Sequence, residues 1–107
     1  MKVVVAEGAT SGKPAWWLLD DAGRRLAWSG RTFAASEEAL AACRAFKAGA
    51  VGFRFEVYLD GRDESRWRVR DERGVTIALA SNAFANRSLS VTDAHAARTG
   101  AGSAAGP

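Results

Sequence analysis

The chain has 107 residues, 48% of them hydrophobic, and carries a formal net charge of +3 from 15 basic and 12 acidic side chains. A chain of this length buries roughly two thirds of the surface that its unfolded form exposes, which is enough for one domain with one core. The near balance of charge argues against a strong nucleic-acid binder but leaves weak polyanion binding open. A single cysteine excludes an intramolecular disulfide, and no apolar run has the roughly 20 residues of a membrane span, so we expect a soluble, cytoplasmic protein.

Two segments of the chain repeat each other at a constant offset of 51 positions, residues 16–47 and residues 67–98. The matches include the residue types least expected by chance. They pair Trp16 with Trp67, Asp20 with Asp71, Gly23 with Gly74 and Phe33 with Phe84. A period of about 50 residues predicts two copies of one structural unit. We therefore predict a single domain over residues 1–98, with repeat one at 1–49 and repeat two at 52–98.

Repeat one is predicted to contain three strands followed by a helix. The strands should span residues 3–6, 16–19 and 26–29. Residues 20–23 read Asp-Asp-Ala-Gly, which predicts a hairpin turn with a glycine available for a positive φ angle. Phe33 should act as an apolar plug before a helix that begins at Ser36 and ends at Gly49. We expect the Ser36 hydroxyl to accept a hydrogen bond from a free amide of the first turn.

Repeat two is predicted to follow the same order. Apolar and polar residues alternate over residues 55–60 and again over residues 66–70, which is typical of half-buried strands. Ile77 and Leu79 continue the apolar face on a third strand. A helix should then span about residues 88–98, although its β-branched residues make it a weak helix former.

The sequence also predicts part of the core and the end of the domain. Trp16, Trp28 and Trp67 fall on the expected core faces of their strands, where bulk alone accounts for them. From Thr99 onward the chain is made of glycine, alanine, serine and proline, which offer little apolar surface to bury. We therefore expect residues 99–107 to form a disordered tail.

Each repeat carries the pattern Trp-x-Leu/Val-x-Asp-x-x-Gly, followed by an aromatic plug and a short helix that ends in Lys47 or Arg98. In this pattern the chain resembles the YegP-like family of small uncharacterised proteins, over about residues 3–98. The resemblance implies a β-β-β-α unit used twice and no established biochemical function. The predicted fold class is α+β, with two tandem β-β-β-α repeats about a pseudo-twofold axis and an antiparallel sheet that carries both helices on one face.

The sequence offers few groups for catalysis or cofactor binding. Residues 8–13 resemble a phosphate-binding loop, but only three residues separate the glycines where four are needed, so a hairpin turn is predicted. Cys43 is the one thiol and His95 the one histidine; we expect Cys43 to be a small buried hydrophobe and His95 a partly exposed helix residue. No residues have the spacing of a zinc site. We predict no catalytic residues, no cofactor, no metal and no enzymatic activity.

Arg66, Arg68 and Arg70 alternate along a predicted strand, so their guanidinium groups should share one face of the sheet. With nearby Arg54 and Arg62 they could follow a phosphate backbone or hold an acidic partner. This pattern supports an alternative function, weak binding of nucleic acid or another polyanion.

The preferred interpretation of these arginines is structural. If the first two strands of repeat two form a hairpin, Glu56, Tyr58 and Asp60 lie on the same face as the arginines. Cross-strand ion pairs would then engage the guanidinium groups, and such pairs are a routine source of sheet stability.

The corresponding strand of repeat one presents an apolar strip, Trp17 and Leu19, on the equivalent face. An exposed strip of this kind commonly marks an interface. The leading prediction is therefore a small non-enzymatic module that binds a protein partner or self-associates, through Trp17 and Leu19 or through an exposed sheet edge. No membrane and no small-molecule substrate is indicated.

Overall fold

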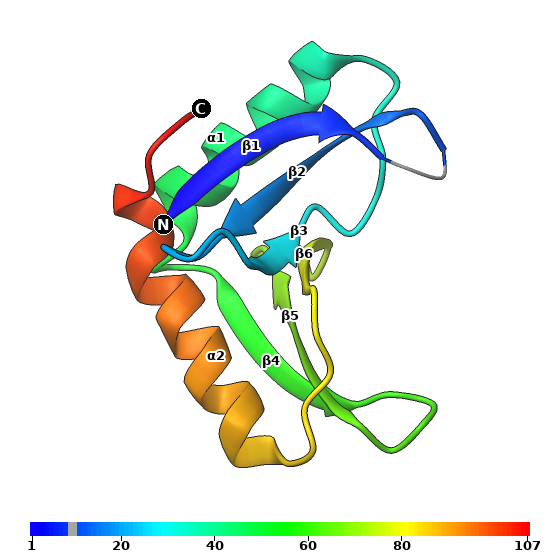
Figure 1. Ribbon diagram of the computed structural model, residues 1–107, viewed down its shortest axis with the longest axis vertical. Helices are drawn as coiled ribbons and strands as arrows, with labels where there is room; N and C mark the ends of the chain where they lie inside the picture. Colours follow the sequence, from blue (N-terminus) through cyan, green and yellow to red (C-terminus); the bar gives the residue numbers. More distant parts are fainter. Residues whose placement is uncertain (9–10) are drawn as a thin grey trace.

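The computed structural model describes residues 1–8 and 11–107, so the turn predicted over residues 8–13 lies partly outside the described residues. Three strands and a helix are followed by three more strands, a second helix and a short 3-10 helix (Figure 1). The elements are β1 Lys2–Glu7, β2 Pro14–Leu19, β3 Arg25–Trp28, α1 Ser36–Gly49, β4 Arg54–Leu59, β5 Ser65–Arg70, β6 Thr76–Ala80, α2 Arg87–Gly100 and η1 Ala101–Ser103. The α+β class predicted from the sequence is confirmed.

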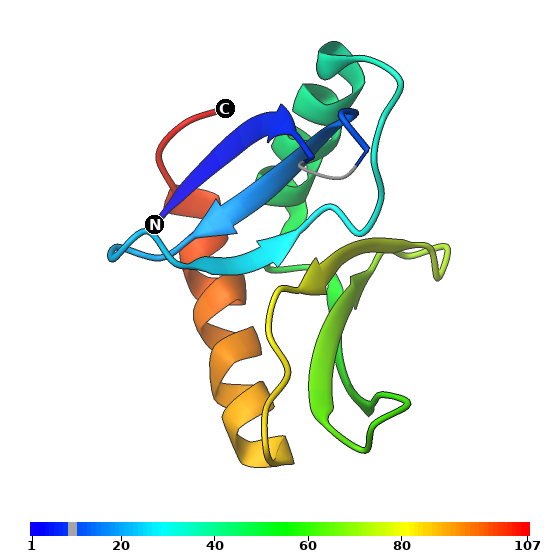
Figure 2. The same ribbon diagram turned by 45° about the vertical axis from the view of Figure 1, so that its right-hand side comes forward.

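All six strands form one antiparallel sheet in the order β1-β2-β3-β6-β5-β4. Figures 1 and 2 show β1 to β3 in the upper part of the molecule and β4 to β6 in the lower part. The two parts join where β3 pairs with β6, with Ala27 opposite Ala80 and Trp28 opposite Leu79. The sheet is therefore continuous, and β1 and β4 are its two edges.

Both helices lie on one face of this sheet. Trp16 of β2 stacks on Phe46 of α1 with 4.7 Å between ring centroids, and Trp67 of β5 donates a hydrogen bond to Asp93 of α2. The register from Leu18 through Ala27, Ala80 and Ala78 to Val69 places these strand residues on the same face. All are buried, so the core lies between the sheet and the helices.

Trp28 is not on the core face, where we predicted it. Alternation along β3 turns the fully buried Ala27 toward the helices, so Trp28 occupies the opposite face and is partly exposed. Trp16 and Trp67 are fully buried, as predicted.

The helix ends differ from the sequence prediction in two ways. Ala35, rather than Ser36, precedes the first turn of α1, and no side chain of the described residues caps that end. In α2, by contrast, the Asn86 side chain accepts a hydrogen bond from the Leu89 amide at 3.0 Å, which lets the helix start at Arg87. Within the described part of the chain, neither 14-residue helix is long and apolar enough to cross a membrane.

Residues 99–107 do not form the predicted disordered tail. Helix α2 extends to Gly100, η1 follows, and Ala101 and Ala104 are buried. The chain then pairs with the start of β1, where the Val3 amide donates to the Ala105 carbonyl at 2.8 Å. Small side chains allow this close packing, and a Cβ at Gly106 would collide with the Val3 carbonyl oxygen. The small residues of this segment therefore allow it to pack closely against β1, and they do not indicate disorder.

Candidate functional site

The sheet face opposite the helices carries a row of residues that crosses all six strands. Each member lies directly opposite the next on the neighbouring strand, and each is partly exposed. In strand order the row is Val4, Trp17, Trp28, Leu79, Arg68 and Glu56. Directly opposite side chains in a sheet have Cβ atoms about 5 Å apart, so the row is a continuous surface. Its first four members, called the apolar patch below, are followed by two charged residues.

Two tryptophans form the centre of the apolar patch. Trp17 and Trp28 are cross-strand partners, and with Arg25 and Ser81 they line a shallow hollow of about 250 Å³. The Arg25 guanidinium lies over the Trp17 ring, 5.0 Å from its centroid. Leu19 is also partly exposed, but a register shift after Leu18 separates it from the row. The sequence pattern predicts Trp17 and Leu19 on this face but assigns Trp28 to the core. The local pattern that could have indicated the correct face is the alternation of Trp28 with the small Ala27.

The predicted ion pairs of the arginine strip are present. Arg66 Nε lies 2.8 Å from Asp60 Oδ2, and the Nε atoms of Arg68 and Arg70 each lie 3.2 Å from Glu56 Oε1. The hydrogen bond from Arg66, helped by backbone amides, lowers the pKa of Asp60 below its ordinary value. Arg54 Nη1 also lies 3.8 Å from Glu56 Oε2, so two carboxylates face four guanidinium groups and balance about half of their charge.

Arg68 also contacts Tyr58, with its guanidinium 4.7 Å from the ring centroid. This cation–π contact and the ion pair to Glu56 hold the Arg68 side chain down on the sheet. The arginines that the sequence singled out are therefore engaged with neighbours on the uncovered face rather than extended into solvent.

Cys43 and His95 occupy different environments. Cys43 is fully buried on α1, and burial raises the pKa of its thiol, so it is protonated at neutral pH. His95 is exposed on α2 beside β4. In residues 1–8 and 11–107, no three histidine, cysteine, aspartate or glutamate side chains gather as metal ligands would.

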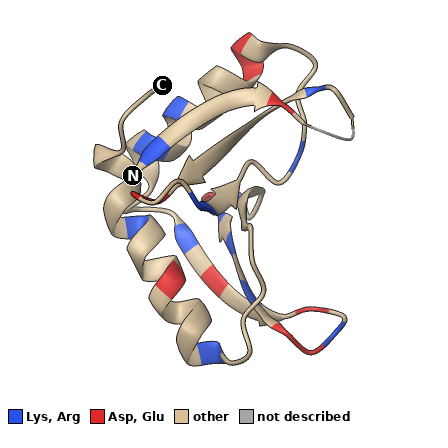
Figure 3. Ribbon diagram, viewed as in Figure 1, with Lys and Arg blue, Asp and Glu red and all other residues tan. Residues whose placement is uncertain are grey.

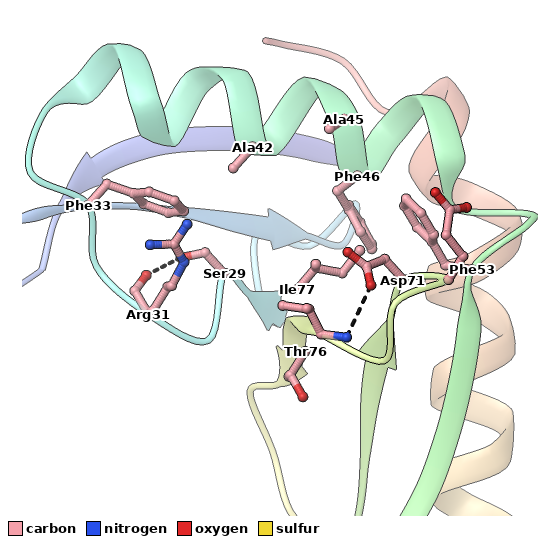
Figure 4. Close-up of a pocket in the computed structure, with 12 residues that line it drawn as sticks. Ser29, Arg31, Phe33, Ala42, Ala45, Phe46, Phe53, Asp71, Thr76 and Ile77 are labelled. Atoms are coloured by element: carbon pink, nitrogen blue, oxygen red, sulfur yellow. Dashed lines mark hydrogen bonds between the residues drawn. The ribbon is translucent and has the colours of Figure 1, made fainter.

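A cavity of about 260 Å³ lies between α1, the loop after β3 and the turn between β5 and β6 (Figure 4). Its walls are mainly apolar and include Phe33, Phe46 and Phe53. Two of the polar groups at its rim are used locally: Ser29 Oγ donates to the Arg31 carbonyl at 2.6 Å, and an Asp71 carboxylate oxygen accepts two backbone amides of its own turn. The residues that line the cavity are spread from position 29 to position 77, so no short sequence motif could predict it.

The two buried tryptophans differ in one polar contact. Trp67 Nε1 donates to Asp93 Oδ2 at 2.7 Å, whereas Trp16 Nε1 is buried and has no hydrogen-bond partner among the described residues. Ala42, which lines the cavity of Figure 4, occupies the position in α1 that Asp93 occupies in α2. In α1, therefore, an alanine stands where α2 has the carboxylate that accepts from a tryptophan. The indole of Trp16 is left without a partner among the described residues, and the alanine lines the cavity.

These features place the chain in a class of small α+β proteins in which a six-stranded antiparallel sheet carries two helices on one face. Among solved structures, it is similar to the yegP protein of E. coli, a protein of unknown function, with 10% identity, a TM-score of 0.79 and coverage of 96% of this chain and 87% of that one. It is also similar to a UPF0339 protein from Shewanella oneidensis, with 7% identity, a TM-score of 0.78 and coverage of 94% and 84%. The YegP-like fold implied by the sequence is therefore confirmed.

At the level of sequence, no family model matches the chain, and no curated protein matches it. At identities of 10% and below, the two structural neighbours show the fold alone. Function has to be argued from the surface of this chain.

Proposed function

We propose that this protein is a small, non-enzymatic, cytoplasmic binding module whose apolar patch docks another protein surface, with a second copy of the chain as the first partner to test. The observation that supports this is the pair Trp17 and Trp28, side by side and partly exposed on a face that neither helix covers. Tryptophan is enriched at the energetic centres of protein interfaces because it buries a large, rigid surface. A twofold axis through the patch would bring it against itself.

We further propose that the domain consists of two tandem β-β-β-α repeats about a pseudo-twofold axis. Three observations support the repeat. Helices α1 and α2 have the same length and start 51 positions apart. Register shifts occur at Leu18/Leu19 and at Val69/Arg70, again one period apart. At the centre of the sheet, Trp28 pairs with Leu79, its own counterpart in the second repeat.

Replacing Trp17 by serine should weaken self-association at least about tenfold, because an aromatic anchor at the centre of an interface commonly contributes more than 1.4 kcal/mol. Sedimentation velocity over a range of protein concentrations measures this effect. Val51→Ser is the matched control, since Val51 is 69% exposed and lies outside the patch.

The parent and the Val51→Ser variant should dimerise alike, with little dependence on salt, because the contact is apolar. A parent protein that stays monomeric at millimolar concentration would rule out self-association. Dimerisation that Trp17→Ser leaves unchanged would move the interface elsewhere.

Weak binding of nucleic acid or another polyanion through Arg66, Arg68 and Arg70 is the second candidate. Its support is the common face of the three arginines next to the aromatic ring of Tyr58. The ion pairs to Asp60 and Glu56 count against it, because they neutralise part of the positive charge and hold the guanidinium groups against the sheet.

Fluorescence anisotropy with labelled single- and double-stranded oligonucleotides tests this alternative at low and physiological salt. Affinity that falls steeply with salt, and that is lost when all three arginines are replaced by alanine, would support it. No binding at low salt would reject it, and that is the result we expect from the ion pairs.

A further inference from the structure

The two edges of the sheet differ in what lies beside them. At the β1 edge, the Ala105 amide donates to the Met1 carbonyl at 3.0 Å, so the C-terminal segment runs parallel to the start of β1. Lys47 of α1 anchors this segment by donating to the Gly106 carbonyl at 3.3 Å. An extended piece of chain thus pairs with an edge strand and contacts the adjacent helix.

No described strand or segment pairs with the outer side of β4. Strand β4 runs beside α2 (Figure 1). Between the two elements lies a groove of about 270 Å³, called the β4–α2 groove below. It is lined by Phe55, Val57, Arg87, Val91, Ala94, His95 and Arg98. Beyond Val57 and Arg87, a second hollow of about 310 Å³ continues along β4 to Leu59, which is 66% exposed. A free backbone edge therefore runs beside a surface that combines apolar and basic side chains.

The charged groups of the groove are all basic. Arg87 and Arg98 stand at the two ends of α2, where Figure 3 shows basic positions, and no carboxylate lines the groove. Arg98 donates to the Val51 carbonyl at 2.6 Å. Arg87 is exposed and makes no ion pair within the described ranges. The groove thus has positive ends and an apolar middle that includes Val91, 45% exposed.

We propose that the β4–α2 groove binds an extended, acidic segment of a partner protein, which adds to β4 as a seventh strand. Backbone hydrogen bonds to the free edge would supply affinity, and alternate side chains would face α2. The comparison with the β1 edge rests on the proposed tandem repeat, in which Arg98 is the counterpart of Lys47. The free edge and the basic lining do not depend on it.

The spacing of the two arginines indicates the sequence that fits. Arg87 and Arg98 are about three helical turns apart, roughly 16 Å along the axis. The first and fifth positions of an extended chain are about 13 Å apart, and the long arginine and glutamate side chains span the remaining distance. The segment should therefore present carboxylates at its first and fifth positions and an apolar side chain at the third, all facing α2. Glu-Thr-Val-Thr-Glu is the simplest probe with this pattern.

The test is a titration of the full, ¹⁵N-labelled chain with capped Glu-Thr-Val-Thr-Glu, followed by amide chemical shifts and by hydrogen exchange. Saturable shifts should be confined to β4 and α2, and outward-facing β4 amides should become protected from exchange. Arg87→Glu should weaken binding at least about tenfold, as should Val91→Asp. Leu89→Asp is the matched control, because Leu89 is 49% exposed on the same helix but outside the groove.

Several results would overturn the proposal. They are the absence of saturable shifts at millimolar peptide, equal binding of the charge-reversed peptide Lys-Thr-Val-Thr-Lys, and shifts centred on β1 or the apolar patch. A loss with Leu89→Asp as large as with Val91→Asp would also contradict it, as would a dimer dissociated by Arg87→Glu, which would place a second copy at this edge. Circular dichroism checks that the three exposed-site variants fold. Trp17→Ser should leave peptide binding unchanged, so failure of the apolar-patch proposal and failure of this one are distinguishable.

Discussion

Replacing Phe46 by alanine should lower the free energy of unfolding by about 3–5 kcal/mol. Phe46 is 1% exposed and stacks on Trp16 in the main core. It also forms one wall of the 260 Å³ cavity shown in Figure 4, so its removal would widen a hollow that already adjoins the core. Urea unfolding, followed by tryptophan fluorescence and by circular dichroism, measures the change. Because small domains have only about 5–15 kcal/mol of total stability, the variant should be close to unfolding at ambient temperature.

Phe46→Leu is the control for this experiment. It keeps most of the buried volume, so it should cost clearly less than Phe46→Ala. A loss below about 1 kcal/mol for Phe46→Ala would mean that the ring is not held between α1 and β2 as described. Equal losses for the two variants would show that the aromatic stacking on Trp16, rather than filled volume, is what stabilises this part of the core.

Replacing Asp93 by alanine should lower stability by about 1–3 kcal/mol, because it leaves the buried Trp67 Nε1 without an acceptor. Asp93→Asn keeps a side-chain oxygen at the same position and should restore most of the loss. Urea unfolding at neutral pH provides the comparison. If alanine and asparagine behaved alike, the hydrogen bond from Trp67 would contribute nothing measurable.

Asp93 should also make stability depend on pH. Burial is the main reason that its pKa is raised above the ordinary value of 3.8, with a smaller contribution from the Asp20 carboxylate. A raised pKa means that the folded state binds the proton more tightly than the unfolded state. The stabilising contribution is therefore complete below pH 3.8 and is lost as the pH rises through the pKa of the folded state.

Unfolding of the parent and of Asp93→Asn at a series of pH values isolates this contribution, because asparagine does not titrate. The parent should gain stability relative to the variant as the pH falls from neutral toward 3.8. Asp60, whose pKa is lowered, makes the protein less stable in acid, but it does so equally in both proteins. The burial of Asp93 would be contradicted if the stability of the parent relative to the variant did not change with pH. It would also be contradicted if the parent gained stability relative to the variant as the pH rose.

Elements defined by local patterns were predicted well from the sequence. The strands of repeat two follow from period-two alternation, and the hairpin turns follow from aspartate accepting amides of its own turn, as Asp20 and Asp71 do. The ion pairs of Arg66, Arg68 and Arg70 were predictable for the same reason, since a hairpin register follows from neighbouring strands. In each case the interacting residues are close in sequence.

The errors concern contacts between distant segments. Trp28 was assigned to the core, but the register of β3 with β2 and β6 turns it outward and buries Ala27 instead. The tail was predicted to be disordered because its residues are small. In the folded chain, small size is what lets Ala104 and Gly106 fit against the edge of β1. Composition alone carries no information about such a fit.

By itself the sequence determined the α+β class, the order of strands and helices, the burial of Cys43, and the arginine strip with its partners. These follow from periodicity and turn chemistry within short windows. Only the tertiary structure decided that Trp17 and Trp28 adjoin on the uncovered face, and that the β1 edge is paired while the β4 edge has no partner among the described residues. Those features depend on cross-strand register and on the path of the C-terminus, which are set by packing of the whole domain rather than by any local pattern.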